Sequence, residues 1–94
     1  MELDKLVHQP TRLQIFAYLY RHGESSFTDL TSALDLTEGN LSSHLQRMED
    51  AGAVEITKQF VDDRPQTSAA LTDDGLTLFE DHVQQLQTLI DGLE

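Results

Sequence analysis

Apolar residues between positions 28 and 51 recur at three- and four-residue intervals, which is the spacing of one apolar face on a helix. Two such stripes follow one another, formed by Leu30, Ala33 and Leu34 and then by Leu41, Leu45 and Met48. Asp35 and Leu36 would form the turn between them, and Thr37 can cap the second helix with its side-chain oxygen. Gly52 would stop that helix. The pattern predicts a helix-turn-helix unit over about residues 28–51.

The N-terminal segment predicts a short helical lead-in over residues 3–8. A longer helix would run from Pro10 to about Arg21, because proline suits the first helical turn. Gly23 would end it. The side chains of this helix are apolar or aromatic almost all round: Leu13, Ile15, Phe16, Ala17, Tyr18, Leu19 and Tyr20. Since one core face of a small domain needs fewer apolar residues, some of this surface is expected to contact another subunit.

Alternating apolar and polar residues predict a β-hairpin over about residues 53–71. Its buried face would carry Val54, Ile56 and Phe60 on one strand, interrupted by Lys58, and Thr67, Ala69 and Leu71 on the other. A turn over residues 62–65 would join the two strands. Earlier in the chain, residues 25–27 suit a very short strand, after which Thr28 can cap the next helix.

The C-terminal segment predicts a helix over about residues 73–92, capped by Thr72 and with two aspartates in its positive first turn. Apolar residues then follow at alternating intervals of three and four, as in a heptad seam: Leu76, Phe79, Val83, Leu86 and Ile90. The first half of the seam would pack on the chain's own first long helix, while the second half, widened by Leu89, projects past a small core. We therefore expect a homodimer whose interface includes Leu3, Leu6, Phe16, Tyr20, Phe79, Val83, Leu86, Leu89 and Ile90.

Three segments of the chain resemble winged-helix transcriptional regulators close to the MarR and ArsR families. The run LTEGNLSSHLQRMEDAG looks like their recognition helix, HQPTRLQIFAYLY resembles their first helix, and DDRPQTSAALTDDG resembles their wing tip, returning strand and start of the last helix. The resemblance covers residues 6–90. It implies an α+β, mostly helical fold, a winged helix-turn-helix with a C-terminal dimerisation helix, as a single domain over residues 1–94. An aromatic residue often stands in this family where the chain has Ala69, which suggests a thinner wing or a partner side chain in the gap.

The resemblance further implies a homodimeric, sequence-specific DNA-binding transcriptional regulator, with helix 37–50 in the major groove and wing 60–66 on the backbone or minor groove. The helix leaves small or hydrogen-bonding residues off its apolar stripe, and such groups read base edges. With the wing they give the expected DNA-binding set: Thr37, Gly39, Asn40, Ser42, Ser43, Gln46, Arg47, Lys58, Arg64 and Gln66. Simpler roles stay open, since Asn40 and the two serines could form a capping cluster, and Arg64 could pair with an adjacent aspartate.

The net charge of −11 argues against this function, because DNA affinity rests largely on cations that release counterions from phosphate. Six acidic side chains lie in residues 72–94, in a helix that is far from the groove in the resembling family, but six more lie in residues 24–50 against Arg47 alone. The acidity could reflect a salt-rich host. It could also mark a protein-interaction module that has kept the fold and lost DNA binding. A basic stripe on a dimer would count against the module, formed by Arg12, Arg21, Arg47, Lys58 and Arg64.

Ninety-four residues suit one domain. The absence of cysteine excludes disulfides and thiolate metal sites, and the four histidines lack the spacing of a zinc site, so we expect no metal and no cofactor. No glycine-rich phosphate loop, nucleophile elbow or acid/base pair indicates an enzyme. Without a bilayer-spanning apolar run or a signal-peptide pattern, we expect a cytoplasmic protein with no membrane contact. Any effector would be another protein or a small molecule bound at the dimer interface.

Overall fold

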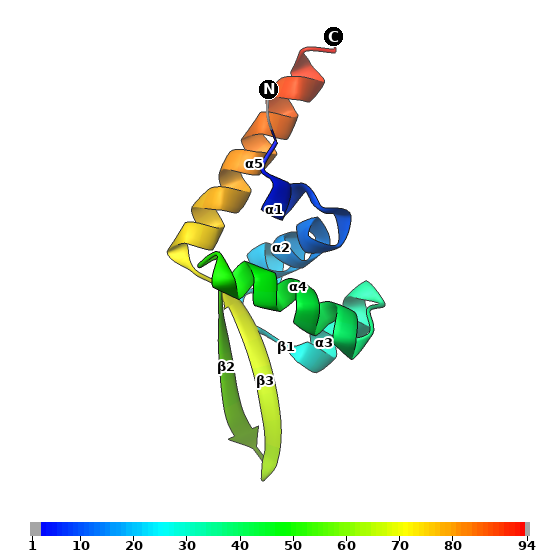
Figure 1. The fold of residues 1–94 in the computed structure, drawn as a ribbon, viewed down its shortest axis with the longest axis vertical. Coiled ribbons are helices and arrows are strands. Elements are labelled where there is room, and N and C mark those ends of the chain that lie inside the picture. Colours follow the sequence, from blue (N-terminus) through cyan, green and yellow to red (C-terminus); the bar gives the residue numbers. More distant parts are fainter. Residues whose placement is uncertain (1–2, 94) are drawn as a thin grey trace.

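A computed structural model describes residues 3–93 of the chain, so Glu94, counted above among the acidic residues, lies outside the described part. The fold is α+β and mostly helical, as the sequence predicted. Its elements are α1 (Lys5–His8), α2 (Pro10–His22), β1 (Ser25–Ser26), α3 (Phe27–Leu34), α4 (Glu38–Asp50), β2 (Val54–Val61), β3 (Arg64–Leu71) and α5 (Asp73–Asp91). The molecule is elongated, about 54 × 25 × 20 Å, with α5 and the β2–β3 hairpin reaching in opposite directions from the other helices (Figure 1).

The ends of the longer helices are fixed by local side-chain chemistry. Thr37 caps α4 by accepting a hydrogen bond from the backbone N–H of Asn40 at 3.1 Å, and Thr72 caps α5 in the same way from Gly75 at 3.0 Å. Pro10 occupies the first turn of α2, and Gly23 ends that helix with a φ of 76°, a conformation that glycine adopts without strain. These caps and stops agree with the sequence-based predictions.

The start of α3 differs from the prediction. Ser26, not Thr28, caps this helix, because its hydroxyl oxygen accepts the backbone N–H of Asp29 at 3.1 Å. Phe27 therefore lies in the first turn of α3 instead of in the short strand. The cap moves because Ser25 and Ser26 pair with β3 as β1, which leaves Ser26 extended at the point where the helix begins. The strand and the cap share one residue.

The sheet is antiparallel with strand order β1–β3–β2. In the central strand, Ala69 is fully buried between Ser25 of β1 and Ile56 of β2, so this chain itself covers the small residue. The hairpin turn is tighter than predicted. Only Asp62 and Asp63 form it, with φ values of 52° and 63°, and the next two residues already belong to β3. Two residues with positive φ give the turn whose twist matches a hairpin.

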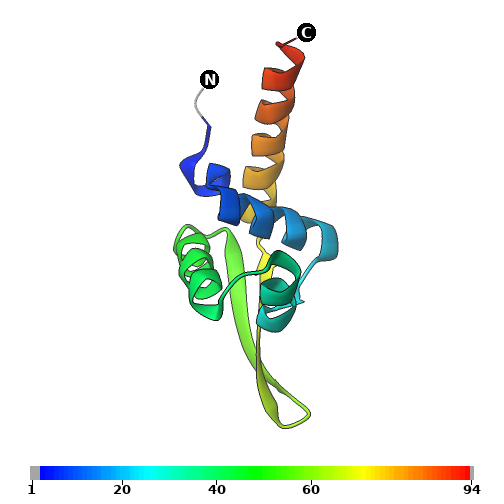
Figure 2. The same ribbon diagram turned by 90° about the vertical axis from the view of Figure 1, so that its right-hand side faces the viewer.

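The core lies where α2 crosses α4, α5 and the base of the sheet (Figure 2). Its fully buried large side chains include Ile15, Phe16, Leu30, Leu41, Leu45 and Met48. The rings of Phe16 and Phe79 stack with centroids 6.0 Å apart and join α2 to α5. Phe16 has no exposed surface, so the expectation that its ring contacts a second subunit is wrong, whereas Phe79 is 7% exposed and packs mainly inside the monomer. Ala33, predicted on the apolar stripe, is exposed.

The hairpin extends well beyond the core. Val54, at the start of β2, is buried, whereas Phe60 near the tip is 77% exposed and pairs across the ladder with Pro65. The expectation that Phe60 lies on a buried face is therefore wrong. Alternation assigns a side chain to one face of a strand, but burial also requires a helix over that face, and none of the described helices reaches the tip (Figure 1).

The base of the hairpin is joined to α5 through one short backbone seam. The N–H of Thr72 donates to the carbonyl oxygen of Ala53 at 3.0 Å, and the Thr72 hydroxyl donates to the carbonyl oxygen of Gly52 at 2.6 Å. The same hydroxyl oxygen accepts the capping bond from Gly75. Thr72 therefore ties the end of α4, the hairpin and the start of α5 together.

Candidate nucleic-acid interface

Helix α4 buries one stripe and exposes the rest of its surface. Leu41, Leu45 and Met48 have no exposed surface, because they pack into the core at three- and four-residue spacing. The predicted DNA-binding residues of this helix are all exposed: Gly39, Asn40, Ser42, Ser43, Gln46 and Arg47. A Cβ added at Gly39 would meet no atom within 4 Å, so this turn of α4 is open to close approach. The exposed strip is polar and has little side-chain bulk.

Two adjoining hollows that share Phe27, Ser42 and Thr67 lie between α4 and the wing, which we define as β2, β3 and their turn, and we refer to them together as the hollow. Ser42 and Gln46 line it from α4, and Lys58 and Gln66 line it from the wing. Arg64 lies at the tip end of the same hollow. Five of the ten predicted DNA-binding residues therefore meet around one surface depression. Gln66 is half-buried, and the other four are exposed.

Acidic residues also belong to this surface. Glu38 and Glu49 line the hollow from α4, and the side-chain amide nitrogen of Gln46 donates to Asp50 at 2.9 Å. The Gln46 amide oxygen is left as the group available to a donor outside the helix. Thr37, also predicted to contact DNA, uses its hydroxyl oxygen to cap α4. Sequence reasoning noted the acidic residues but could not place two of them inside the depression.

A second cluster, formed by Arg12, His44 and Arg47, lies on the other side of α4. Of these residues, only Arg47 belongs to the DNA-binding set predicted from the sequence. The Nε of Arg12 donates to the carbonyl oxygen of Leu6 at 2.7 Å, and one terminal nitrogen is 3.2 Å from Nδ1 of His44. Since a guanidinium cannot accept, Arg12 donates to the imidazole, which holds His44 neutral at Nδ1. Burial first, then the charges of Arg12 and Arg47, lower the pKa of His44 below its usual range.

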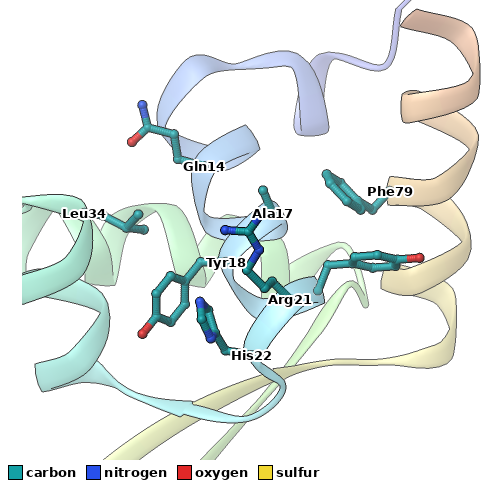
Figure 3. Close-up of a pocket in the computed structure, with 8 residues that line it drawn as sticks. Gln14, Ala17, Tyr18, Arg21, His22, Leu34 and Phe79 are labelled. Atoms are coloured by element: carbon teal, nitrogen blue, oxygen red, sulfur yellow. The ribbon is translucent and has the colours of Figure 1, made fainter. Parts of the chain in front are cut away.

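Arg21, the remaining cation of α2, lies elsewhere. It lines a separate open hollow of about 640 Å³ with Tyr18, His22 and Leu34 (Figure 3). The rings of Tyr18 and His22 lie together there, with centroids 4.3 Å apart. Phe79 of α5 closes the far side. Arg21, one of the five cations that a basic stripe on a dimer would require, is therefore not part of the surface around α4 in the monomer.

The sequence of residues 11–90 matches the winged helix DNA-binding domain family. The chain belongs to this family. It is 31% identical over 90 residues to an uncharacterized protein of Methanocaldococcus jannaschii, with 96% of this chain and 98% of that protein covered. The solved structure of a transcriptional regulator homologue protein from Pyrococcus horikoshii is 35% identical, with a TM-score of 0.89, and the match covers 95% of this chain and 88% of that one.

A MarR-family structure from Enterococcus faecalis matches 99% of this chain and 91% of its own, with a TM-score of 0.77. Its identity of 24% makes this a likeness of fold alone. The predicted membership in the winged-helix transcriptional regulators is thus confirmed, and both family and fold are those of regulators, not of enzymes. Within residues 3–93, no helix of this winged-helix chain combines the length and hydropathy needed to cross a membrane.

Proposed function

We propose that this winged-helix chain is a homodimeric, sequence-specific DNA-binding transcriptional regulator. In this proposal, α4 enters the major groove and the wing contacts the backbone or the minor groove. The observation that carries it is the exposed strip of α4, because its small and amide side chains can approach base edges without burying an unpaired charge. The family supports DNA as the partner.

The positions of Lys58 and Arg64 support a role for the wing. Both cations face the same hollow as Ser42, so a duplex whose groove received α4 would bring a phosphate backbone towards them. Val61 and Arg64 pair across β2 and β3 beside the two-residue turn, which fixes the direction of the tip. Backbone contacts of this kind position a protein on DNA without reading its sequence.

An unpartnered apolar face on α5 supports the dimer. Val83 and Ile90 of the heptad seam are 45% and 53% exposed, and Leu89, which widens the seam, is 48% exposed. Tyr20 of α2 is also 48% exposed and lies beside Phe79, so the face continues onto α2. A second α5 would remove this surface from water. Leu3, Leu6 and Leu86 are half-buried in the monomer and would lie at the edge of the same interface.

A selection experiment tests the function directly. The purified chain is incubated at low ionic strength with a pool of random duplexes, and retained sequences are amplified over several rounds. The proposal expects one motif repeated with two-fold symmetry, because the two α4 helices of a dimer read two half-sites. A pool that stays random at low salt would reject DNA reading.

The rival function is a protein-interaction module that keeps the winged-helix fold. One specific observation favours it: Glu38 and Glu49 line the hollow in which the phosphates would lie. If the DNA selection fails, a basic peptide library bound to the same surface is the next measurement. Charge reversal at Glu38 and Glu49 would then abolish binding, whereas a DNA-binding protein would gain affinity from the same change.

A further inference from the structure

Arg12 holds the corner between α1 and α2 but does not use all of its donors there. Its three hydrogen bonds go to the carbonyl oxygens of Lys5 and Leu6 and to the His44 ring. A guanidinium carries five N–H donors, so two remain, one on each terminal nitrogen. Two parallel N–H groups on the terminal nitrogens are the arrangement that binds a phosphate with two hydrogen bonds.

Within residues 3–93, none of the groups that Arg12 contacts carries a negative charge. Carbonyl oxygens and a neutral imidazole satisfy the hydrogen bonds, while the charged neighbour that acts on Arg12 is another cation, Arg47. Burial first, and then the charge of Arg47, lower the pKa of Arg12, which still stays protonated. Two uncompensated cations near each other create a local positive potential in a chain whose net charge is −11.

The cluster stands on the side of α4 opposite the wing. Ser42 faces the wing across the hollow, whereas His44 faces Arg12 of α2, so the exposed strip lies between two groups of cations. In Figure 2, α4 (green) lies below the α1–α2 corner, beside the base of the wing and above its tip. A major groove about 12 Å wide is bordered by one phosphate backbone on each side. A helix lying in it would therefore meet phosphates on both of these flanks.

We propose that Arg12 and Arg47 hold adjacent phosphates of one DNA backbone on the α1–α2 flank of α4, with His44 as the residue that positions Arg12. This inference rests on the proposed function and adds a second anchoring strand to it. Four of the six lysine and arginine residues of the chain would then serve the two flanks in pairs, with Lys58 and Arg64 on the wing side. A helix held from both sides is fixed in depth and tilt.

The salt dependence of binding distinguishes one anchoring flank from two. Each neutralised phosphate contributes about −0.9 to the slope of log affinity against log salt. A dimer that uses only Lys58 and Arg64 gives a slope of about −4, whereas adding Arg12 and Arg47 gives about −7. Anisotropy titrations of the selected duplex and of an unrelated duplex, over a series of KCl concentrations, measure this slope.

Arg12→Gln should reduce the slope from about −7 to about −5 and weaken binding to both duplexes by the same factor, roughly tenfold per subunit near 0.1 M salt. Arg21→Gln is the matched control, because it removes the same charge from the same helix in a different hollow. Arg12→Lys should keep the slope near −7 with weaker affinity, since a point charge replaces the bidentate contact. His44→Asn should also lower affinity at constant slope, because it removes positioning and no charge.

Arg12→Gln also removes bonds to α1, so Arg47→Gln provides a second variant, at an exposed position with no such bonds. It should flatten the slope as much, and the double variant should bring the slope to about −4, because each arginine acts on its own phosphate. Specific binding with a slope near −4 and no effect of either change would overturn the inference and leave the proposed function intact. Absence of any DNA binding by the unmodified chain would overturn both.

Discussion

Gly75, in the first turn of α5, lies against the backbone of Ala53 with no room for a side chain. A Cβ at this position would overlap the carbonyl oxygen of Ala53 and crowd its carbonyl carbon. The same carbonyl accepts the backbone N–H of Thr72 at 3.0 Å, so it cannot turn away without breaking the seam between hairpin and helix. Glycine is required here by close approach and not by an unusual φ.

Gly75→Ala should destabilise the chain by about 1–3 kcal/mol or more, because the added methyl meets fixed backbone instead of a movable side chain. Gly39→Ala is the control, since its Cβ enters open space on α4 and alanine favours a helix by about 0.5–1 kcal/mol. Urea unfolding followed by circular dichroism measures both. Equal stability of the two variants would show that the seam yields.

Leu89→Asp should convert the proposed dimer into a folded monomer. Leu89 is half-exposed, so the change leaves the monomer core intact but places a charge in the seam of α5. Thr88→Asp introduces the same charge one residue earlier, where the side chain is exposed on another face of the helix. Sedimentation velocity at micromolar concentration should find Leu89→Asp monomeric and Thr88→Asp dimeric. An unmodified chain that sediments as a monomer would contradict the interface.

The free energy of unfolding should fall as the pH drops below about 6.5, the pKa of histidine in an unfolded chain. Burial, and then the ring of His8, lower the pKa of His82, with Asp4 acting in the opposite direction. The unfolded chain therefore binds a proton in a range where the folded chain does not, so acid favours unfolding. Above this range both states carry a neutral ring, and the contribution is fully present.

His82→Leu should flatten this pH dependence, because a buried ring with no hydrogen-bond partner among the described residues is replaced by an apolar side chain. His44, whose pKa is also lowered, accounts for the slope that remains. Thermal unfolding at pH 5.5 and pH 7.5 measures the effect, and the stabilities of the unmodified chain and His82→Leu should differ least at pH 7.5. An unchanged slope in His82→Leu would mean that α5 and α1 separate before the ring is protonated.

Gln46→Ala should weaken binding to the preferred duplex by about 1–3 kcal/mol and leave unrelated sequences unaffected, if its free amide oxygen accepts a hydrogen bond from a base. Gln87→Ala is an exact structural match, because Gln87 donates to Asp91 at 2.9 Å as Gln46 donates to Asp50. It lies on α5, away from α4. Competition titrations with single-base variants of the site would locate the position that Gln46 reads, and equal losses on all sequences would exclude base reading.

Arg64→Ala should weaken binding to all duplexes alike and reduce the salt slope by nearly 2 for a dimer, because one phosphate contact per subunit is lost. The residue is exposed at the wing tip beside two aspartates. Asp63→Asn makes the opposite change of charge at the wing tip. Removing this negative charge should raise affinity for DNA without a change in sequence preference. If both variants bind like the unmodified chain, the wing does not touch DNA.

The helix ends could be predicted because their causes are local. Thr37 and Thr72 each lie three residues before the N–H that they cap, so sequence distance and spatial distance coincide. The start of α3 could not be predicted in this way. Ser26 and Thr28 are both capable caps, and the choice depends on pairing between β1 and β3, more than forty residues apart in the sequence.

The candidate site shows the same difference between features with local causes and features with long-range causes. The exposed strip of α4 follows from the helical period, so sequence alone places Ser42, Ser43 and Gln46 on one surface. The contact between Arg12 and His44 joins residues 32 apart and depends on how α2 packs on α4. Phe60 shows why burial on a strand is harder to predict. The alternation of apolar and polar residues does not indicate how far the hairpin extends beyond the helices that cover it.

The bonds of Thr72 have a mechanical consequence for the proposed dimer. They join the base of the wing to the first turn of α5, so the wing and the helix move together as one rigid unit. Any change in the crossing angle of the two α5 helices would move both wings and alter the distance between the two α4 helices. The contact between the two α5 helices, at the end of the molecule far from the DNA, would then set the spacing of half-sites that the dimer can bind.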